Sequence, residues 1–405
     1  MLRGECRNTG VNQMSAIDLV IVGGGCAGLS LARELVLRGV DKNVLVIEPR
    51  TAYEDDRSWC FWAPSRPESA DSILSLVHRR WSRWRFGQAG QPQRARQADG
   101  LSYQYLRSID FYRACCETIE SSPWVQLQLG VRVQSVVPVA AGWQVTTDHE
   151  TIVTREVMDT RPPEPSRAAN ATLQQVFLGW EIELQAGSAA SEAIDLDSVE
   201  LMSDMRLVRG EFCFTYILPI SATRLLVEVT FFARTKLEQP VLEEKLSDLL
   251  DRRGWHNATV MRREYAVLPM GLPALKCQPG QPASAGMGGG ALRSSSGYGF
   301  LRIQRWAQGC AAPYVATGEV IGHAEPSFWW RWMDQLFLDV IEASPRLAPG
   351  LFDRMLGRTE PVRFVRFMND EATWRDCLSV IRSLPKRPFV EALARRLLTG
   401  IGGKS

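Results

Sequence analysis

One acidic residue stands inside a run of apolar residues. Glu228 lies in the segment 225–232, which reads Leu-Leu-Val-Glu-Val-Thr-Phe-Phe. Strict alternation along a strand would place Glu228 on the same face as Leu226 and Thr230. A carboxyl group in an apolar cavity stays protonated near neutral pH and can donate its proton. The pattern alone favours the simpler alternative, a glutamate that faces solvent from a half-exposed strand.

A glycine turn near the start of the chain is a second candidate site. Gly23, Gly25 and Gly28 fill a G-x-G-x-x-G motif between an apolar β run and an amphipathic helix. Such a turn brings backbone N–H groups and the positive end of the helix to a pyrophosphate. The next strand ends at Glu48, where an acid hydrogen-bonds ribose hydroxyls and would repel a 2′-phosphate. The pattern predicts a site for FAD or NAD rather than NADP; the alternative is a glycine-rich turn in an ordinary α/β domain.

An aromatic segment follows this unit. Residues 56–62 read Asp-Arg-Ser-Trp-Cys-Phe-Trp, which is unusual for an exposed loop. One interpretation is a wall beside the cofactor, with Arg57 as a cofactor contact and Trp59, Phe61 and Trp62 as substrate contacts. The other is a buried aromatic plug that only fills the core.

Two further groups could approach a bound cofactor. Asp159 and Arg161 follow a predicted strand, and they either lie near the cofactor or form an ion pair within a loop. The segment 280–299 is rich in glycine and serine and precedes a helix. Gly288 and Gly289 would there offer backbone N–H groups to the flavin pyrophosphate or the ring edge. A flexible linker is the alternative.

The elements that must position these residues form an α/β pattern. Residues 17–48 read as a βαβ unit, whereas the alternating runs at 174–184, 211–218 and 224–232 predict an antiparallel sheet that roofs a substrate cavity. The segment 78–86 alternates charged and aromatic residues like one amphipathic strand. We predict a Rossmann-type FAD-binding domain, an antiparallel-sheet substrate domain and a C-terminal helical region. The expected segments are a disordered leader (1–16), a first FAD-binding segment (17–62), mixed segments (63–160), the substrate-binding sheet (161–275), a second FAD-binding segment (276–325) and the helical region (326–405).

Composition excludes several classes of protein. The formal net charge of the 405 residues is +2, which argues against nucleic-acid binding by charge. Nine cysteines without a C-x-x-C pair predict reduced thiols in the cytoplasm and no metal site. No apolar run is long enough for a transmembrane helix, and the first residues lack the apolar core of a signal peptide. Thirteen tryptophans favour a large apolar or aromatic ligand.

Taken together, these segments resemble the bacterial lycopene β-cyclase family of flavoproteins. The resemblance runs from about residue 17 to residue 393. The most particular pieces are Trp-Cys-Phe-Trp at 59–62 and Val-Glu-Val-Thr at 227–230. The other matching segments are 23–28, 56–58, 214–219, 264–269 and 296–300.

The resemblance implies an enzyme that closes β-ionone rings at the ends of linear carotenes such as lycopene. It further implies reduced FAD as cofactor, NAD(P)H as the source of electrons, and peripheral association with the cytoplasmic side of a membrane. Glu228 matches the essential acid of the family's Glu-x-Thr motif. Two alternatives remain: a redox flavoenzyme, either a monooxygenase or a dehydrogenase of an apolar substrate, and a carotenoid-binding protein without activity.

Three positions depart from the family pattern. Many members have a second acid directly after the catalytic one, where this chain has Val229. Ala266 replaces the glycine that usually follows two residues after the acid at Glu264. The Gly-Asp pair of many flavoproteins is missing near 286–291. A mechanism that shares a proton between neighbouring residues 228 and 229 is therefore not expected here.

Overall fold

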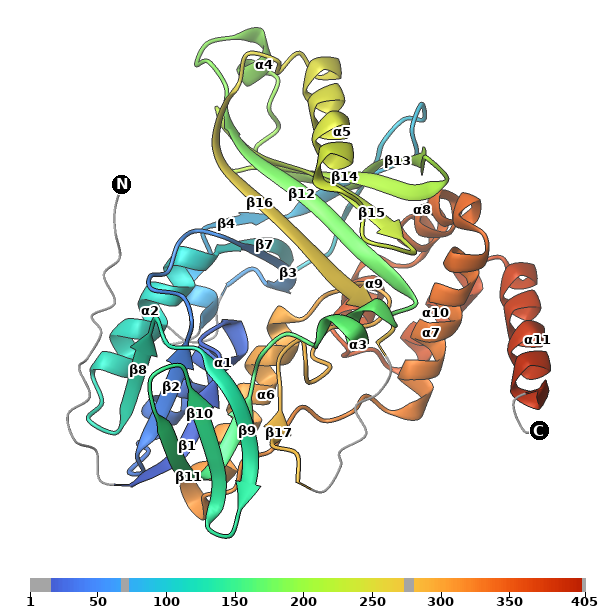
Figure 1. Ribbon diagram of the computed structural model, residues 1–405. Helices are drawn as coiled ribbons and strands as arrows, with labels where there is room; N and C mark the ends of the chain where they lie inside the picture. The colour runs from blue at the N-terminus through green and yellow to red at the C-terminus, as the bar shows by residue number, and fades with distance from the viewer. Residues whose placement is uncertain (1–15, 67–72, 273–279, 403–405) are drawn as a thin grey trace.

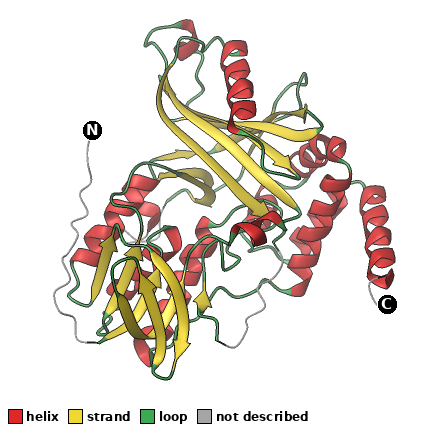
Figure 2. Ribbon diagram, viewed as in Figure 1, coloured by secondary structure: helices red, strands yellow, loops and turns green. Residues whose placement is uncertain are grey.

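Three sheets and a C-terminal group of helices make up the computed structural model, which describes residues 16–66, 73–272 and 280–402 (Figure 1). The predicted disordered leader falls almost wholly outside the described residues. Figure 2 shows strands gathered in the lower and upper regions of the molecule and helices on the right.

The first sheet carries the predicted nucleotide-binding unit. Its order is β8 (Val125–Leu129), β2 (Val44–Glu48), β1 (Ile17–Val22), β11 (Thr151–Asp159), β10 (Gly142–Thr147) and β9 (Val133–Val139), with β17 (Ala283–Ser284) also pairing with β11. The pairs β8–β2, β2–β1, β1–β11 and β11–β17 are parallel, while β9 and β10 are antiparallel additions. The helices of this region are α1 (Cys26–Leu37), α2 (Ser108–Glu120) and α6 (Phe300–Thr317).

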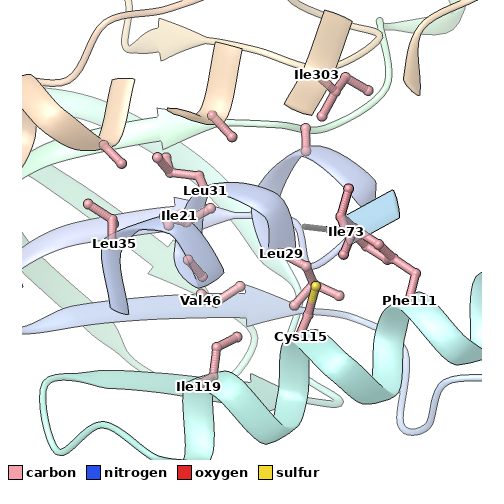
Figure 3. Close-up of a cluster of buried hydrophobic side chains, with 14 of the residues drawn as sticks. Ile21, Leu29, Leu31, Leu35, Val46, Ile73, Phe111, Cys115, Ile119 and Ile303 are labelled. Atoms are coloured by element: carbon pink, nitrogen blue, oxygen red, sulfur yellow. The ribbon is translucent and has the colours of Figure 1, made fainter. Parts of the chain in front are cut away.

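Helix α1 lies at the centre of a buried cluster that joins these elements (Figure 3). Leu31 and Leu35 are fully buried beside Ile21 of β1. Phe111 of α2 and Ile303 of α6 belong to the same cluster. Burial of each such side chain contributes roughly 1.5–3 kcal/mol, so this cluster holds the glycine turn in place.

The second sheet is the predicted antiparallel one. Its order is β16 (Thr259–Met270), β12 (Leu173–Glu183), β15 (Arg224–Ala233), β14 (Glu211–Pro219), β13 (Ser198–Val208), β5 (Arg83–Phe86) and β6 (Arg94–Gln97). All neighbours are antiparallel except β13 and β5. Val227 and Val229 pack in one cluster with α5 (Gln239–Arg252), which covers the outer face. Leu226 and Phe232 belong to a different cluster, on the inner face.

A small third sheet connects the two larger ones. It consists of β3 (Ser58–Pro64), β7 (Leu101–Arg107) and β4 (Arg79–Trp81), all antiparallel. The prediction of one strand over 78–86 was wrong. The chain changes sheet at Ser82, so β4 pairs in the third sheet and β5 in the second. Trp81 and Trp84 are buried on the two sides of this break.

Helices cover the inner face of the second sheet. They are α7 (Phe328–Ala343), α8 (Ala348–Arg358), α9 (Pro361–Met368), α10 (Trp374–Ser383) and α11 (Lys386–Gly402), with short helices η1 (Ile73–Leu76), α3 (Pro165–Ala169), α4 (Ala189–Glu192) and η2 (Pro345–Leu347) elsewhere. The predicted fold class is therefore confirmed. Among the described residues, every helix is too short or too polar to span a bilayer.

Most of the described cysteines are reduced, as expected, and one is not. Six of them are free thiols: Cys26, Cys60, Cys115, Cys213, Cys310 and Cys377. Cys116 is disulfide-bonded, which corrects the expectation of reduced thiols at that position.

Candidate active site

The glycine turn leaves the start of α1 open. Gly23 has a φ of 102°, a conformation that side chains disfavour. A Cβ atom on Gly28 would lie 1.9 Å from the carbonyl oxygen of Gly23, so only glycine lets helix and strand meet there. A Cβ on Gly25 would meet nothing within 4 Å, and no side chain caps the helix at that position. The open N-terminus of α1 fits a pyrophosphate.

Glu48 lies beside this turn, at the end of β2. Its Oε2 atom accepts a hydrogen bond of 2.7 Å from the N–H of Gly24, and its Oε1 atom accepts one of 2.8 Å from Nε of Arg50. Tyr53 donates from its hydroxyl to the carbonyl oxygen of Gly24 at 2.8 Å. The acid is thus hydrogen-bonded to the glycine turn, and its contact with a cofactor ribose stays a prediction.

Arg57 and Asp159 differ in their surroundings. The Arg57 side chain is 53% exposed, with Nε 3.4 Å from Oδ2 of Asp56. Asp159 pairs in register with Val22, immediately before the glycine turn. It forms an ion pair with Arg161, in which Nη2 and Oδ2 are 2.6 Å apart. Asp159 is therefore both a member of a loop ion pair and a neighbour of the glycine turn, and its contact with a cofactor stays a prediction.

The second glycine cluster packs against the first site through its backbone. A Cβ on Gly288 would lie 2.4 Å from the carbonyl oxygen of Arg161, and one on Gly286 would lie 3.0 Å from Cβ of Ala27 in α1. The N–H of Gly289 donates to the carbonyl oxygen of Ala285 within the turn itself. These glycines bring the segment next to the start of α1, and cofactor binding by Gly288 and Gly289 remains a prediction.

Glu228 faces inward from the middle of the second sheet. Strand β15 pairs it with Tyr216 of β14 on one side and Gly179 of β12 on the other. Thr230 donates from its hydroxyl to Oε1 of Glu228 at 2.6 Å. Burial, and then the negative charge of Glu264, raise the pKa of the Glu228 carboxyl to about 8 against the opposing hydrogen bond from Thr230.

The Glu228 side chain is nevertheless only partly covered. Protein groups surround its carboxyl densely, while part of the side chain stays accessible. A proton donor needs this combination, because the surrounding protein favours its neutral form while a ligand can still reach it.

A second carboxyl group, that of Glu264, lies on the other side of Gly179 from Glu228. Gly179 pairs with Glu264 of β16 on its far side, so β12 separates the two acids. A Cβ on Gly179 would lie 3.0 Å from Oε1 of Glu264. The Oε2 atom of Glu264 accepts hydrogen bonds of 2.9 Å from Ser58 and from Arg262. Its buried Oε1 atom, in contrast, has no hydrogen-bond partner among the described residues.

A cavity of about 480 Å³ extends from this region between the inner face of the second sheet and the C-terminal helices. Tyr216 and Phe232 of the sheet line one side of it, and Trp62 and Tyr298 line another. Tyr216 is the register neighbour of Glu228 on β14, and burial chiefly raises the pKa of both Tyr216 and Tyr298. The lining is mostly apolar and suits an apolar ligand. Glu228 itself is not among the lining residues, but its register neighbour Tyr216 is.

The three predicted aromatic contacts separate onto two sides of β3. Trp62 lines the cavity. Trp59 and Phe61 point the other way and stack on Phe300, at ring-centroid distances of 5.4 and 4.9 Å. That side belongs to the cluster of the nucleotide-binding region. Of the three, Trp62 alone is placed for contact with a ligand in this cavity.

Sequence reasoning gave no role to four residues around Glu228. Tyr216 and Tyr298 lie within segments that carried the family resemblance, yet neither was considered as a cavity wall. Gly179 interrupts an otherwise bulky strand, a signal for close approach by a neighbouring group. Glu264 stood in a motif with an altered glycine, so its place beside Glu228 could be found only from strand register.

Comparison with known proteins agrees with this geometry. The family model described as lycopene cyclase protein matches residues 18–394. The lycopene beta-cyclase of Pantoea ananas is 26% identical over 398 residues, which cover 94% of this chain and 98% of the relative. That of Pseudescherichia vulneris is 27% identical, covering 69% of this chain and 70% of the relative.

Solved structures share the fold at low identity. A probable FAD-dependent monooxygenase from Pseudomonas aeruginosa has a TM-score of 0.57 at 16% identity and covers 84% of this chain and 100% of that one. A geranylgeranyl bacteriochlorophyll reductase-like protein from Thermoplasma acidophilum has a TM-score of 0.56 at 12% identity, covering 94% and 96%. The resemblance to lycopene β-cyclases is confirmed: the chain belongs to the lycopene cyclase family, and its activity is that of a cyclase, an intramolecular isomerisation.

Proposed function

We propose that the chain closes β-ionone rings at the ends of linear carotenes and that Glu228 is the general acid that starts the reaction. The observation that carries this proposal is a buried carboxyl group held neutral next to Tyr216, which lines an apolar cavity. An ionised glutamate could not donate a proton, and a solvent-facing one would lose it to water near neutral pH.

The reaction needs one proton in and one proton out. Glu228 donates its proton to the terminal C=C bond of the carotene, which leaves a tertiary carbocation. The neighbouring double bond attacks this cation and closes the ring, and loss of a ring proton to a base sets the β double bond. The mass of the carotene is unchanged, so no oxidant is consumed.

The cavity wall suits a cationic intermediate. The rings of Trp62, Tyr216 and Tyr298 line the cavity, and aromatic faces attract cations. The apolar lining also excludes water, which would otherwise trap the carbocation as an alcohol. We therefore expect these three residues to control how much of the substrate ends as a ring.

FAD is the cofactor that the glycine turn supports. Gly23, Gly25 and Gly28 would hold its pyrophosphate and Glu48 its adenosine ribose, while Arg57, Asp159, Gly288 and Gly289 stay predicted contacts. When bound in its reduced form, with NAD(P)H as the source of electrons, the electron-rich flavin would stabilise nearby positive charge.

Pigment analysis tests the function directly. Expression in cells that accumulate lycopene should yield carotenes of the same mass as lycopene with the shorter-wavelength absorption of a ring-closed polyene. Unchanged lycopene in the presence of soluble, flavin-loaded protein would refute the proposal. A product of altered mass, formed with stoichiometric NAD(P)H consumption, would instead favour a redox flavoenzyme.

The rate of cyclisation should depend on pH through Glu228. The acid is active when protonated, so the rate should be full well below pH 8 and fall about tenfold per pH unit above it. Glu264→Gln removes the charge that helps to raise this pKa. The falling limb should move to lower pH, with a rate about fivefold lower at pH 8 if the shift is about one unit.

Glu181→Gln is the matched control for this experiment. Glu181 is also buried and bonds the same arginine, Arg262, at 3.0 Å, but its charge is not among the causes of the raised pKa of Glu228. Its pH profile should stay in place. If the pH–rate profiles of both variants shift by the same amount, the effect is a general one on packing. That result would contradict the role given to Glu264.

A further inference from the structure

We propose that a pocket lined by arginines on the C-terminal helices binds the phosphate of an anionic phospholipid and holds the mouth of the apolar cavity against a bilayer. The inference deepens the proposed function and rests on it in one respect, since a linear carotene is dissolved in lipid.

The pocket has a volume of about 270 Å³ and a lining without any acidic residue. It is lined by Arg358 at the end of α8, Arg363 of α9, and Arg375, Ser379, Arg382 and Ser383 of α10. Guanidinium groups bind phosphate oxygens in pairs of parallel hydrogen bonds, and hydroxyls add further donors. The lining therefore suits a phosphate monoanion or diester.

Three of the four arginines of the pocket are not neutralised by an acidic group within the described residues of the chain. Arg358, Arg375 and Arg382 have no ion-pair partner among the described residues. Arg363 is the exception, since it lies 3.7 Å from Glu360 and 3.9 Å from Asp376, whose buried carboxylate is also held at 2.8 Å by Arg366, outside the pocket. Uncompensated arginines around one concave site indicate an anionic ligand.

Helix α10 joins this pocket to the cavity. Arg375, Ser379 and Arg382 are spaced four and then three residues apart, which places them on one stripe. Trp374 and Ile381 are seven residues apart on the adjacent stripe and are 70% and 46% exposed. Ile381 also lines the apolar cavity. The basic pocket and the cavity mouth therefore lie on neighbouring sides of one helix.

Other exposed apolar side chains surround the same mouth. Trp329 of α7 and Val390 of α11 both line the cavity and are 54% and 63% exposed, and Phe328 is 72% exposed. In Figure 1, α7, α10 and α11 lie on the same side of the molecule. Exposed aromatic residues beside arginines are typical of protein surfaces that rest at the headgroup level of a membrane.

A bilayer fits this surface better than a soluble anion does. A free phosphate would engage the arginines but leave the adjacent tryptophans in water, whereas a phospholipid satisfies both stripes of α10 at once. Docked in this way, the cavity would open directly onto the acyl chains. A carotene could then reach Glu228 without crossing water.

Vesicle co-sedimentation of the full-length protein tests the proposal. The probes are vesicles of phosphatidylcholine alone and vesicles containing phosphatidylglycerol. Wild-type protein should prefer the anionic vesicles. Arg375→Gln combined with Arg382→Gln should weaken binding to them about 25-fold, since each basic group near a charged membrane contributes roughly a factor of five. The matched control is Arg38→Gln with Arg113→Gln, which removes the same charge from the end of α1 and from α2 and should change binding much less.

Equal losses in the two double variants would overturn the pocket by showing that only net charge matters. Stabilisation of the protein by inorganic phosphate, lost in the pocket variant and without vesicle binding, would identify a soluble anion as the ligand and also overturn the proposal. A cyclisation assay with lycopene in detergent micelles separates an effect on membrane binding from an effect on catalysis. The pocket variant should cyclise it at the wild-type rate and be impaired only with lycopene in vesicles. Vesicle binding without any cyclisation would contradict the proposed function alone.

Discussion

Glu228→Gln is expected to reduce cyclisation by about a thousandfold or more while leaving flavin binding at the wild-type level. Gln has nearly the shape of the protonated acid and keeps a hydrogen-bond partner for Thr230, which now bonds Oε1 at 2.6 Å. It cannot release a proton to a double bond. Pigment analysis of lycopene-accumulating cells, together with the flavin absorbance of the purified variant, measures both quantities.

Glu228→Asp is the companion variant. It keeps a carboxyl group in the same apolar surroundings but withdraws it by one methylene, so partial activity is expected. Wild-type activity in the Gln variant would exclude Glu228 as the acid. Loss of activity together with loss of flavin would show damage to the fold instead.

The pH dependence of the free energy of unfolding gives an independent check on the protonation state of Glu228. Its pKa in the folded protein lies near 8, above the ordinary value of 4.5, so the folded state holds more protons between these values. The free energy of unfolding of the wild type should therefore fall as pH rises from about 4.5 to 8, relative to the Gln variant, which does not titrate. Melting temperatures at pH 5 and pH 9 measure this difference. A difference in stability between the two proteins that is the same at pH 5 and pH 9 would contradict the buried, neutral acid.

Local patterns were enough to predict much of this molecule. The strand, glycine turn, helix and acid at residues 17–48 lie together because they are neighbours in sequence, and the structure places them as expected. The face of Glu228 followed from alternation, since Leu226 packs inward and Val227 outward. Both features depend on fewer than about 35 consecutive residues.

Contacts between distant segments could not be predicted in the same way. The approach of Glu264 to Glu228 depends on the register of three strands and on the missing side chain of Gly179. The family's second acid is absent at Val229, which packs outward under α5. Here a second carboxyl comes from another strand on the same face as Glu228, which no spacing in the sequence reveals.

Alternation within β3, in contrast, separates its aromatic residues onto two faces. Trp59 and Phe61 share one face by their spacing, and Trp62 must take the other. The break at Ser82 carries no glycine or proline that would indicate it. Both β4 and β5 bury a tryptophan, and only their partner strands differ, so the segment looks like a single strand. The arginines of the basic pocket come from three helices and gather only when those helices pack.

A pair of alanine substitutions in the glycine turn should separate ligand contact from folding. Gly28→Ala is expected to abolish flavin binding and lower the melting temperature, because its Cβ would lie 1.9 Å from a backbone oxygen and the turn must open. Gly25→Ala should fold normally, since its φ of −80° suits alanine and a Cβ there meets nothing within 4 Å. The added methyl group would instead face the pyrophosphate site and weaken FAD binding by about tenfold or more.

Fluorescence titration of the apoprotein with FAD and thermal melts without FAD measure the two effects. Gly350→Ala in α8 is the control, because its Cβ also meets nothing within 4 Å and it lies in the helical region away from the turn. It should change neither FAD affinity nor cyclisation. Unaltered FAD affinity in Gly25→Ala would show that the cofactor does not approach the start of α1. That result would remove the cofactor from the site to which β1, α1 and Glu48 assign it, while leaving the acid at Glu228 to be tested on its own.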